Sequence, residues 1–526
     1  MMLGMNFHRM RWATGVMLVW LSASASAQTA HTIEILAARE IRKHPDMPGV
    51  QRLLGDVQLG WQEAVLRCDS AWRFDDGPFE VMGEVRLVDG RGGTLRAQRM
   101  RLDPDASVVD AFGAPVRWQD GQQELSGEAF RYGMQSRSLI WSEIADMQQI
   151  DTLSGDLLTL RSQRGRLLVD ADELQLGGDI YLEDADQTLR SDSLHLLHLD
   201  ADPVLTIFGA TSVWTTDGSR SFHADRGQLD LAAGQGWLGA KTDGPLAWFQ
   251  KGDLLTAGDS LALTDSTHQT IAGQVFVTDT LASFALWGDR LDLTEDTLLL
   301  TGDAHLSEGK AEDAPWLIAA DTILRLGAGE GDRMLAWPQA AMRQEASTGF
   351  CDTLIWTETD SLLAFVGQPV LWTDGSRLSG DSLWAQLKAS GIDSLVARGH
   401  VCMTSALESG PDSLHHTISG RALDGFFTEN GELTHIYVAG NSEVIQFDEA
   451  GVNVNHLVSS KLKIRFADGE VSNILMLGQP NGVYESTASA DQTALPICPH
   501  SAQPAPINFP LRPQLQSRHP RPQSSP

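Results

Sequence analysis

The sequence predicts an all-β protein built from tandem repeats of about 30 residues, with almost no helix. Three observations lead to this fold class. Two short motifs recur along the chain, the segments that carry them alternate apolar and polar residues, and no segment shows sustained helical periodicity with caps. Internal repeats of this length are typical of stacked supersecondary units. We therefore expect about fifteen repeats, and about thirty strands, within the 526 residues.

The first motif is Gly-x-Val-x-Leu, as in Gly55-Asp-Val-Gln-Leu59 and Gly83-Glu-Val-Arg-Leu87. Related forms begin at Gly113, Gly178, Gly273, Gly302, Gly367 and Gly399. The steps from 55 to 83 and from 83 to 113 are 28 and 30 residues long. Alternation places Val57 and Leu59 on one face of a strand that follows the glycine, which predicts a half-buried strand.

The second motif is Asp-Ser-Leu or Asp-Thr-Leu, and it is predicted to lie on the other strand of each repeat. It begins at Asp151, Asp192, Asp259, Asp279, Asp296, Asp352, Asp360, Asp381, Asp393 and Asp412. Asp-Gly pairs, which accept the positive φ of tight hairpins, separate many of the strands, as at Asp89-Gly90 and Asp217-Gly218. Each repeat is therefore predicted to be a two-stranded hairpin.

The same motif also suggests catalysis, because Gly380-Asp381-Ser382-Leu383 resembles the signature of GDSL serine esterases. A hydrolase needs one activated serine with its own base and acid, whereas this motif has ten copies. We interpret Ser260 and Ser382 as structural residues and keep a hydrolase only as a third hypothesis. His195 and His198, and the pair His415-His416, lack the further ligands of a metal site, so no metal, no cofactor and no enzymatic activity is predicted.

The two ends of the chain differ from the middle. Residues 1–27 have a basic start, an apolar stretch and an Ala25-Ser26-Ala27 cleavage site, which predicts a cleaved signal peptide and a periplasmic location, with an association with the outer membrane left open. Residues 488–526 are rich in proline and are predicted to be disordered. Between them we expect repeat domains over 28–210 and 211–487, the second continuous with the first. The net charge of −30 disfavours nucleic acid as a partner.

Four cysteines are too few for a disulfide framework. Cys68 and Cys351 occupy equivalent positions before an aspartate and are expected to be small buried residues. A bridge between Cys351 and Cys402 is left open.

The run Gly-Asp-Val-x-Leu, then Cys68-Asp-Ser-Ala-Trp72, then Gly-Glu-Val-x-Leu resembles the OstA-like family. This family includes the periplasmic lipopolysaccharide-transport proteins LptA and LptC and the N-terminal domain of LptD, and the resemblance is closest to the large OstA-like proteins of Bacteroidota. It covers roughly residues 30–200 directly and the rest through the repeat. The resemblance implies a long antiparallel β-jelly-roll whose apolar inner face holds acyl chains. It also implies edge-strand contacts with other Lpt-type transport proteins.

Stacked alternating strands join their apolar faces into one stripe, and an acyl chain in such a stripe would gain roughly 0.8 kcal/mol per buried methylene. The predicted groove-facing residues are Val57, Leu59, Val85, Leu87, Val116, Trp118, Val370 and Trp372. The leading hypothesis is a protein that binds lipopolysaccharide or a related lipid in its transport or in outer-membrane assembly. The alternative is a secreted structural or adhesive β-repeat protein whose core is filled by its own side chains.

Overall fold

The computed structural model describes residues 32–486 apart from short gaps at 76, 122, 151–156, 199–203, 231–232, 234, 265–267, 280–283, 310–315, 328–331, 345–346, 358, 374–375, 389–390, 407–414, 429–431, 449–450 and 468–469. The predicted signal peptide (1–27) and proline-rich tail (488–526) lie outside the described residues, as do the motif positions Asp151 and Asp412.

The described residues form one sheet of forty strands, and their helical content is the three-residue 3-10 turn η1 (Val169–Ala171). The first part contains β1 Ile33–Ala37, β2 Glu40–Lys43, β3 Val50–Trp61, β4 Ala64–Phe74, β5 Phe79–Val88, β6 Thr94–Asp103, β7 Val108–Asp120, β8 Gln123–Gly133, β9 Ser138–Trp141, β10 Ala145–Ile150, β11 Leu157–Ser162, β12 Arg164–Leu168, β13 Glu173–Glu183 and β14 Gln187–Leu197.

The middle part contains β15 Val204–Ile207, β16 Thr211–Thr215, β17 Arg220–Ala224, β18 Arg226–Asp230, β19 Gln235–Gly239, β20 Ala247–Lys251, β21 Leu254–Gly258, β22 Ser260–Leu263, β23 Gln269–Asp279, β24 Phe284–Leu293, β25 Thr297–Glu308, β26 Trp316–Leu326, β27 Arg333–Trp337, β28 Ala340–Gln344, β29 Ser347–Cys351, β30 Thr353–Thr357, β31 Leu362–Val366, β32 Val370–Thr373, β33 Ser376–Ser379 and β34 Ser382–Lys388. The last part contains β35 Gly391–Ala406, β36 His415–Phe427, β37 Leu433–Phe447, β38 Asn453–Ala467, β39 Glu470–Leu477 and β40 Asn481–Ser486.

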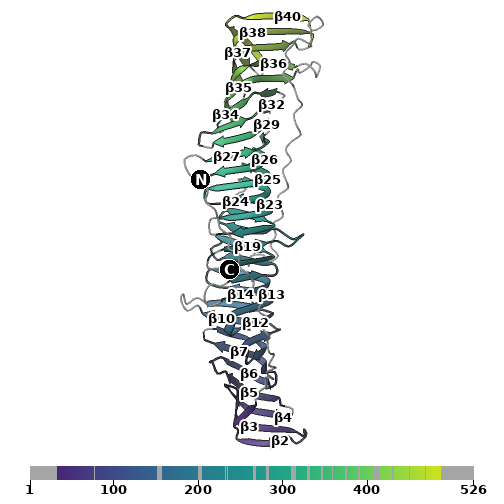
Figure 1. Ribbon diagram of the computed structural model, residues 1–526, viewed down its shortest axis with the longest axis vertical. Helices are drawn as coiled ribbons and strands as arrows, with labels where there is room; N and C mark the ends of the chain where they lie inside the picture. The colour runs from purple at the N-terminus through teal and green to yellow at the C-terminus, as the bar shows by residue number, and fades with distance from the viewer. Residues whose placement is uncertain are drawn as a thin grey trace, which may run out of the picture.

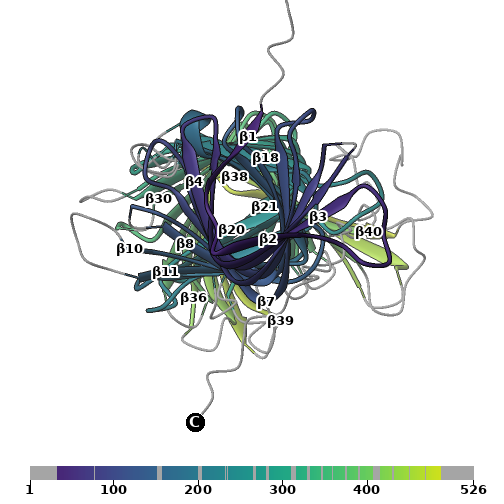
Figure 2. The ribbon, with the colours of Figure 1, turned by 90° about the horizontal axis from the view of Figure 1, so that it is seen from below.

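These strands stack in chain order along one long axis, from β2 at one end to β40 at the other (Figure 1). Neighbouring strands pair antiparallel, as in the consecutive ladder from β3 to β8. Seen along the long axis, the strands wrap around a common centre (Figure 2). The predicted fold class, a long antiparallel β-jelly-roll of stacked repeats with almost no helix, is confirmed.

The recurring glycines form corners in the middle of long strands. In β3 the pairing with β4 shifts register between Leu54 and Val57, where Gly55 and Asp56 have φ values of 76° and 48°. The same pair of left-handed residues recurs at Gly83-Glu84 and Gly399-His400. Such bulges bend a strand, so each long segment turns from one wall of the jelly-roll to the other.

These corners correct two expectations. The glycine was expected to precede a strand; Gly367 does precede β32, but at corners such as Gly55, Gly83 and Gly399 the glycine lies inside a strand. About thirty strands were expected, but the described residues contain forty, because several long segments are interrupted at a corner. Asp352, for example, separates β29 from β30. The proposed division at residue 210 remains a prediction, and the ladder runs through it, since β14 pairs with both β15 and β16.

Candidate lipid-binding interior

The inward side chains form one apolar row that crosses the ladder in direct register. Near the N-terminal end, Leu59 lies opposite Leu66, and the row continues through Leu87, Leu95 and Trp118. Near the other end, the same row contains Leu371, Leu378, Met403 and Ile418. A single core cluster extends from Ile33 to Ile464. Alternating strands therefore produce the continuous apolar interior that their pattern predicts.

Six of the eight predicted groove residues lie on this inner face: Val57, Leu59, Val85, Leu87, Val116 and Trp118. They belong to the core cluster, and each is at most 1% exposed. Val370 and Trp372 are only half-buried, and the residue between them, Leu371, is the one in the core cluster. Trp372 instead packs edge-on against Phe350, with ring centroids 5.7 Å apart. The structure thus brings the first six together and places these two on the opposite face of the sheet.

Two tryptophans place an indole N–H in the largely apolar interior. Trp61 and Trp118 are 2% and 1% exposed, and the indole Nε1 of each has no hydrogen-bond acceptor among the described residues. A buried donor without an acceptor costs about 1–3 kcal/mol. An oxygen of a bound molecule in the interior would remove that cost.

An aspartate packs against the glycine of the next corner, both in Cys68-Asp69-Ser70 and in Asp-Ser-Leu motifs such as the one at Asp381. A Cβ added to Gly83 would lie 2.2 Å from Oδ2 of Asp69, and one added to Gly399 would lie 2.0 Å from Oδ2 of Asp381. At Gly273, Gly367 and Gly399 the aspartate belongs to the Asp-Ser-Leu or Asp-Thr-Leu motif, so there the two recurring motifs are two halves of one contact between neighbouring strands. Ser382, which follows Asp381, begins β34 at such a corner.

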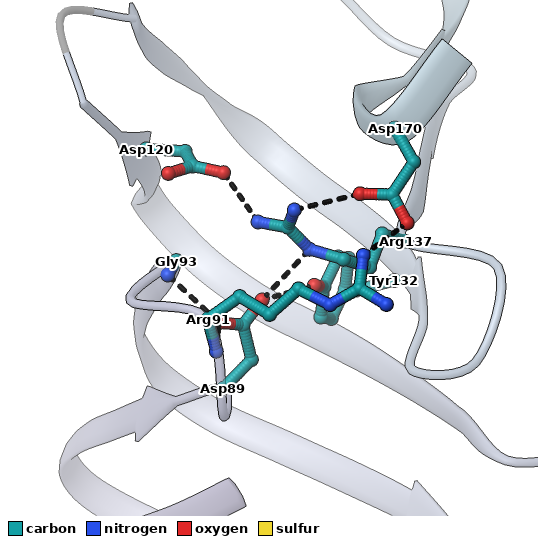
Figure 3. A network of polar contacts seen from close by, with 7 residues as sticks. All are labelled: Asp89, Arg91, Gly93, Asp120, Tyr132, Arg137 and Asp170. Atoms are coloured by element: carbon teal, nitrogen blue, oxygen red, sulfur yellow. Dashed lines mark hydrogen bonds and ion pairs between the residues drawn. The ribbon is translucent and has the colours of Figure 1, made fainter.

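A polar cluster ties together four loops at one margin of the N-terminal repeats (Figure 3). The Arg137 guanidinium, 9% exposed, donates from Nε to Oδ2 of Asp89 at 3.2 Å and from Nη1 to Oδ1 of Asp170 at 2.8 Å, and its Nη2 contacts Asp120. Arg91 donates to the other oxygen of Asp170 at 2.5 Å. Residues up to 79 positions apart are joined in this way.

Asp89 is the most enclosed carboxylate of this cluster. Its Oδ2 accepts the Tyr132 hydroxyl at 2.7 Å, and its Oδ1 accepts the Gly93 N–H at 2.8 Å. Burial on its own would raise the pKa of Asp89, but these hydrogen bonds and the charge of Arg137 together lower it. The hydrogen bond from Arg137 likewise lowers the pKa of Asp170. With two guanidinium groups and three carboxylates, we interpret the cluster as a structural clamp.

The described cysteines include both free thiols and a bridged residue. Cys68 and Cys351 are buried free thiols, and burial raises the pKa of each to about 12. Cys402 is disulfide-bonded, and because Cys351 is free, the bridge between these two residues that was left open is not formed.

Within the described part of the chain, no group of three or more His, Cys, Asp or Glu side chains is placed to hold a metal ion. His195 lies 2.8 Å from the Glu173 carboxylate through its Nε2. None of the described residues lies in a helix long and apolar enough to cross a membrane.

Among the described residues, both ends of the sheet are open. At one end β1 and β2 pair with β3 and with no other described strand, and Leu36 and Ile41 are 53% and 55% exposed. At the other end β39 and β40 pair with β38 and with no other described strand, and Leu475 and Tyr484 are 49% and 70% exposed. Open strand edges with exposed apolar side chains are sites where another strand can add.

Sequence reasoning missed a second, smaller apolar cluster. Leu246, Ala257 and Phe276 are buried together, with Trp248 and Trp287 packed against them. These residues lie on the face opposite the main core, because Phe276 alternates with Val275 and Val277, which belong to the main cluster. Uninterrupted apolar runs, such as Val275-Phe-Val277, were the available signal for a strand buried on both faces.

Seventeen chains of solved structures match this chain. The crystal structure of LptH from Pseudomonas aeruginosa, described as the LptA homologous periplasmic component of the lipopolysaccharide transport device, matches with a TM-score of 0.20 and 13% identity. The match covers 26% of this chain and 93% of LptH. No family model matches the sequence, and no curated protein matches it either.

Proposed function

We propose that this chain is a periplasmic OstA-like protein that holds acyl chains of lipopolysaccharide or a related lipid against its inner face and joins Lpt-type neighbours through its edge strands. The observation that carries the proposal is the inner row that runs in register from Leu59 to Ile418 and is apolar along most of its length, within a sheet whose described residues leave both ends open. Export by a cleaved signal peptide and action in outer-membrane assembly are parts of the same proposal.

The unpaired indole groups favour a ligand in this interior. Acyl chains of glycolipids are attached through ester and amide groups, whose carbonyl oxygens accept hydrogen bonds. Trp118 Nε1 has no acceptor among the described residues, so a lipid carbonyl beside it would satisfy a buried donor while its methylenes contact the leucine row.

We also propose that the role is binding rather than catalysis. The contact between Asp381 and the Gly399 corner supports this, because it gives the repeated Asp-Ser-Leu motif a packing role at several corners. Labelling by a serine-reactive probe that is lost in Ser382→Ala or Ser260→Ala would argue for the hydrolase hypothesis instead.

Site-specific photocrosslinking tests lipid binding. A benzophenone amino acid at Trp118, which is 1% exposed on the inner face, is expected to form an adduct with lipopolysaccharide when the cells are irradiated. The matched control is Trp237 in β19, which is 45% exposed. Adducts at Trp118 but not at Trp237 support the proposal.

The alternative, a structural or adhesive protein with a filled core, is favoured by one observation. The six inner groove candidates are at most 1% exposed, as expected for side chains that fill their own core. It predicts that neither Trp118 nor a second inner position, Phe79, captures lipid, although the variants still fold. That result would overturn the lipid-binding proposal.

A further inference from the structure

Four arginines stand in direct register on four consecutive strands. Arg67 on β4 lies opposite Arg86 on β5, Arg86 lies opposite Arg96 on β6, and Arg96 lies opposite Arg117 on β7. All four are exposed, and they alternate with core residues such as Leu66 and Leu87, so they project from the outer face. We call these four residues the arginine ladder. At about 4.8 Å per strand, it is roughly 14 Å long.

Within the described part of the chain, the arginine ladder has no ion-pair partner. The nearby arginines do: Arg99 donates to Glu80 at 2.7 Å, and Arg131 donates to Asp110 at 2.7 Å. The acidic residues nearest the ladder along its strands, Asp69 and Glu84, lie at the corner and form no ion pair with it. The carboxylates available on these strands therefore leave the ladder uncompensated.

Like charges directly opposite each other on neighbouring strands destabilise a sheet. A ligand with several anionic groups at similar spacing would convert this repulsion into attraction. Guanidinium groups bind phosphate oxygens through two parallel N–H donors, and four in a line can bind neighbouring phosphates at once. The ladder is thus suited to closely spaced phosphate groups.

The surroundings favour a lipid layer as the source of these phosphates. On the same outer face, Val65 is 38% exposed and lies two residues before Arg67 on β4. The open N-terminal edge adds the exposed Leu36 and Ile41. Exposed apolar side chains among cations are typical of surfaces that bind anionic membranes.

We infer that the arginine ladder binds the phosphate groups at the surface of an anionic lipid layer and so holds the N-terminal end of the protein against a membrane. The inference rests on the proposed function for the presence of a lipid surface, but it uses the outer face rather than the inner row. The two proposals can therefore fail separately. The protein could bind lipid in its interior without binding a membrane through the ladder, or bind a membrane without holding lipid in its interior.

The test uses the full chain and vesicles of phosphatidylcholine, with or without phosphatidic acid, in a flotation assay. Wild-type protein is expected to float only with the phosphatidic acid vesicles, and less so as salt rises. Replacing Arg86 and Arg96 by glutamine is expected to weaken binding about 25-fold, from about fivefold per arginine. The control R290Q/R325Q removes the same charge from arginines paired with Asp292 and Asp332, and is expected to bind like wild type.

Equal losses of vesicle binding in R86Q/R96Q and R290Q/R325Q would overturn the ladder as the binding site, because only the net charge of the protein would then matter. Binding of inorganic polyphosphate without any binding of vesicles would overturn the lipid layer as its source. Sedimentation could instead show a dimer that is lost in R86Q/R96Q while vesicle binding by this variant is unchanged. That result would overturn the lipid layer as the partner of the ladder and favour an acidic surface on a second copy of the chain. Since the substitutions remove a repulsion on exposed strands, circular dichroism of R86Q/R96Q is expected to match wild type.

Discussion

The contact between Asp69 and the Gly83 corner predicts a large and specific cost for a single methyl group. In Gly83→Ala the new Cβ would lie 2.2 Å from Oδ2 of Asp69 and 2.8 Å from its Cβ, an atom that no rotation of the side chain can move away. The left-handed backbone, with φ of 80°, adds roughly 1–2 kcal/mol, and overpacking adds about 1–3 kcal/mol. We expect the local unfolding free energy to fall by about 2–5 kcal/mol.

A matched control separates these two costs. Gly252 also has a positive φ, 58°, but an added Cβ would meet nothing within 4 Å, so Gly252→Ala is expected to cost only roughly 1–2 kcal/mol. Long repeat arrays do not unfold in one step, so the measurement is hydrogen exchange of amides in the strands beside each glycine. In the double variant Asp69→Gly/Gly83→Ala the clash is removed. Its loss of unfolding free energy is therefore expected to be about 1–3 kcal/mol smaller than the sum of the losses in the two single variants. Equal losses for Gly83→Ala and Gly252→Ala would refute the role of the aspartate.

Three further predictions concern the clamp, the thiols and the edges. The pKa values of Asp89 and Asp170 are lowered in the folded protein. Their contribution to stability is therefore complete above the pKa of an aspartate in the unfolded chain, about 3.9, and is lost as the pH falls through their lower pKa values in the folded protein. Protection of the clamp loops should therefore decrease below about pH 4, and less so in Asp89→Asn, as hydrogen exchange can show. The Cys68 thiol, with a pKa raised to about 12, should resist iodoacetamide at pH 8 until denaturant is added, and rapid labelling of the native protein would contradict its burial. Proline at Val483, on the terminal strand β40, should reduce crosslinking to a neighbouring transport protein if that edge accepts a partner, whereas unchanged crosslinking would assign the contact elsewhere.

Alternation predicted the inward face well where each strand has a single apolar side. In β3, Val57 and Leu59 alternate with polar residues, and both are buried as predicted. The rule failed at Val370-Leu371-Trp372, where three consecutive residues are apolar and the period cannot select a face. There the neighbouring strands decide, because Leu371 stands between Gly349 and Leu378 in the ladder.

Contacts between distant segments could not be predicted from the sequence, for a different reason. Both recurring motifs were visible, but their contact, such as Asp381 with Gly399, depends on the register of neighbouring strands, which each corner shifts. The clamp likewise joins Arg91 to Asp170, 79 positions away. The excess of arginine near the N-terminus was evident, whereas the alignment of Arg86 with Arg96 depends on hairpin geometry.

Under the proposed function, the closed interior and the open ends favour lipid entry at the ends of the sheet. The row is sealed within a few strands of the first edge, with Leu87 on β5 and Trp118 on β7 each 1% exposed, so an acyl chain cannot reach these residues directly from the side without separating packed walls. At the ends, Ile35 near the first edge and Met476 near the last are only partly buried against the core. A chain of about ten methylenes gains roughly 8 kcal/mol on burial, which favours its advance between the walls once its end is inserted. Uptake at one open edge and release at the other would then make the direction of the strand ladder the direction of transport.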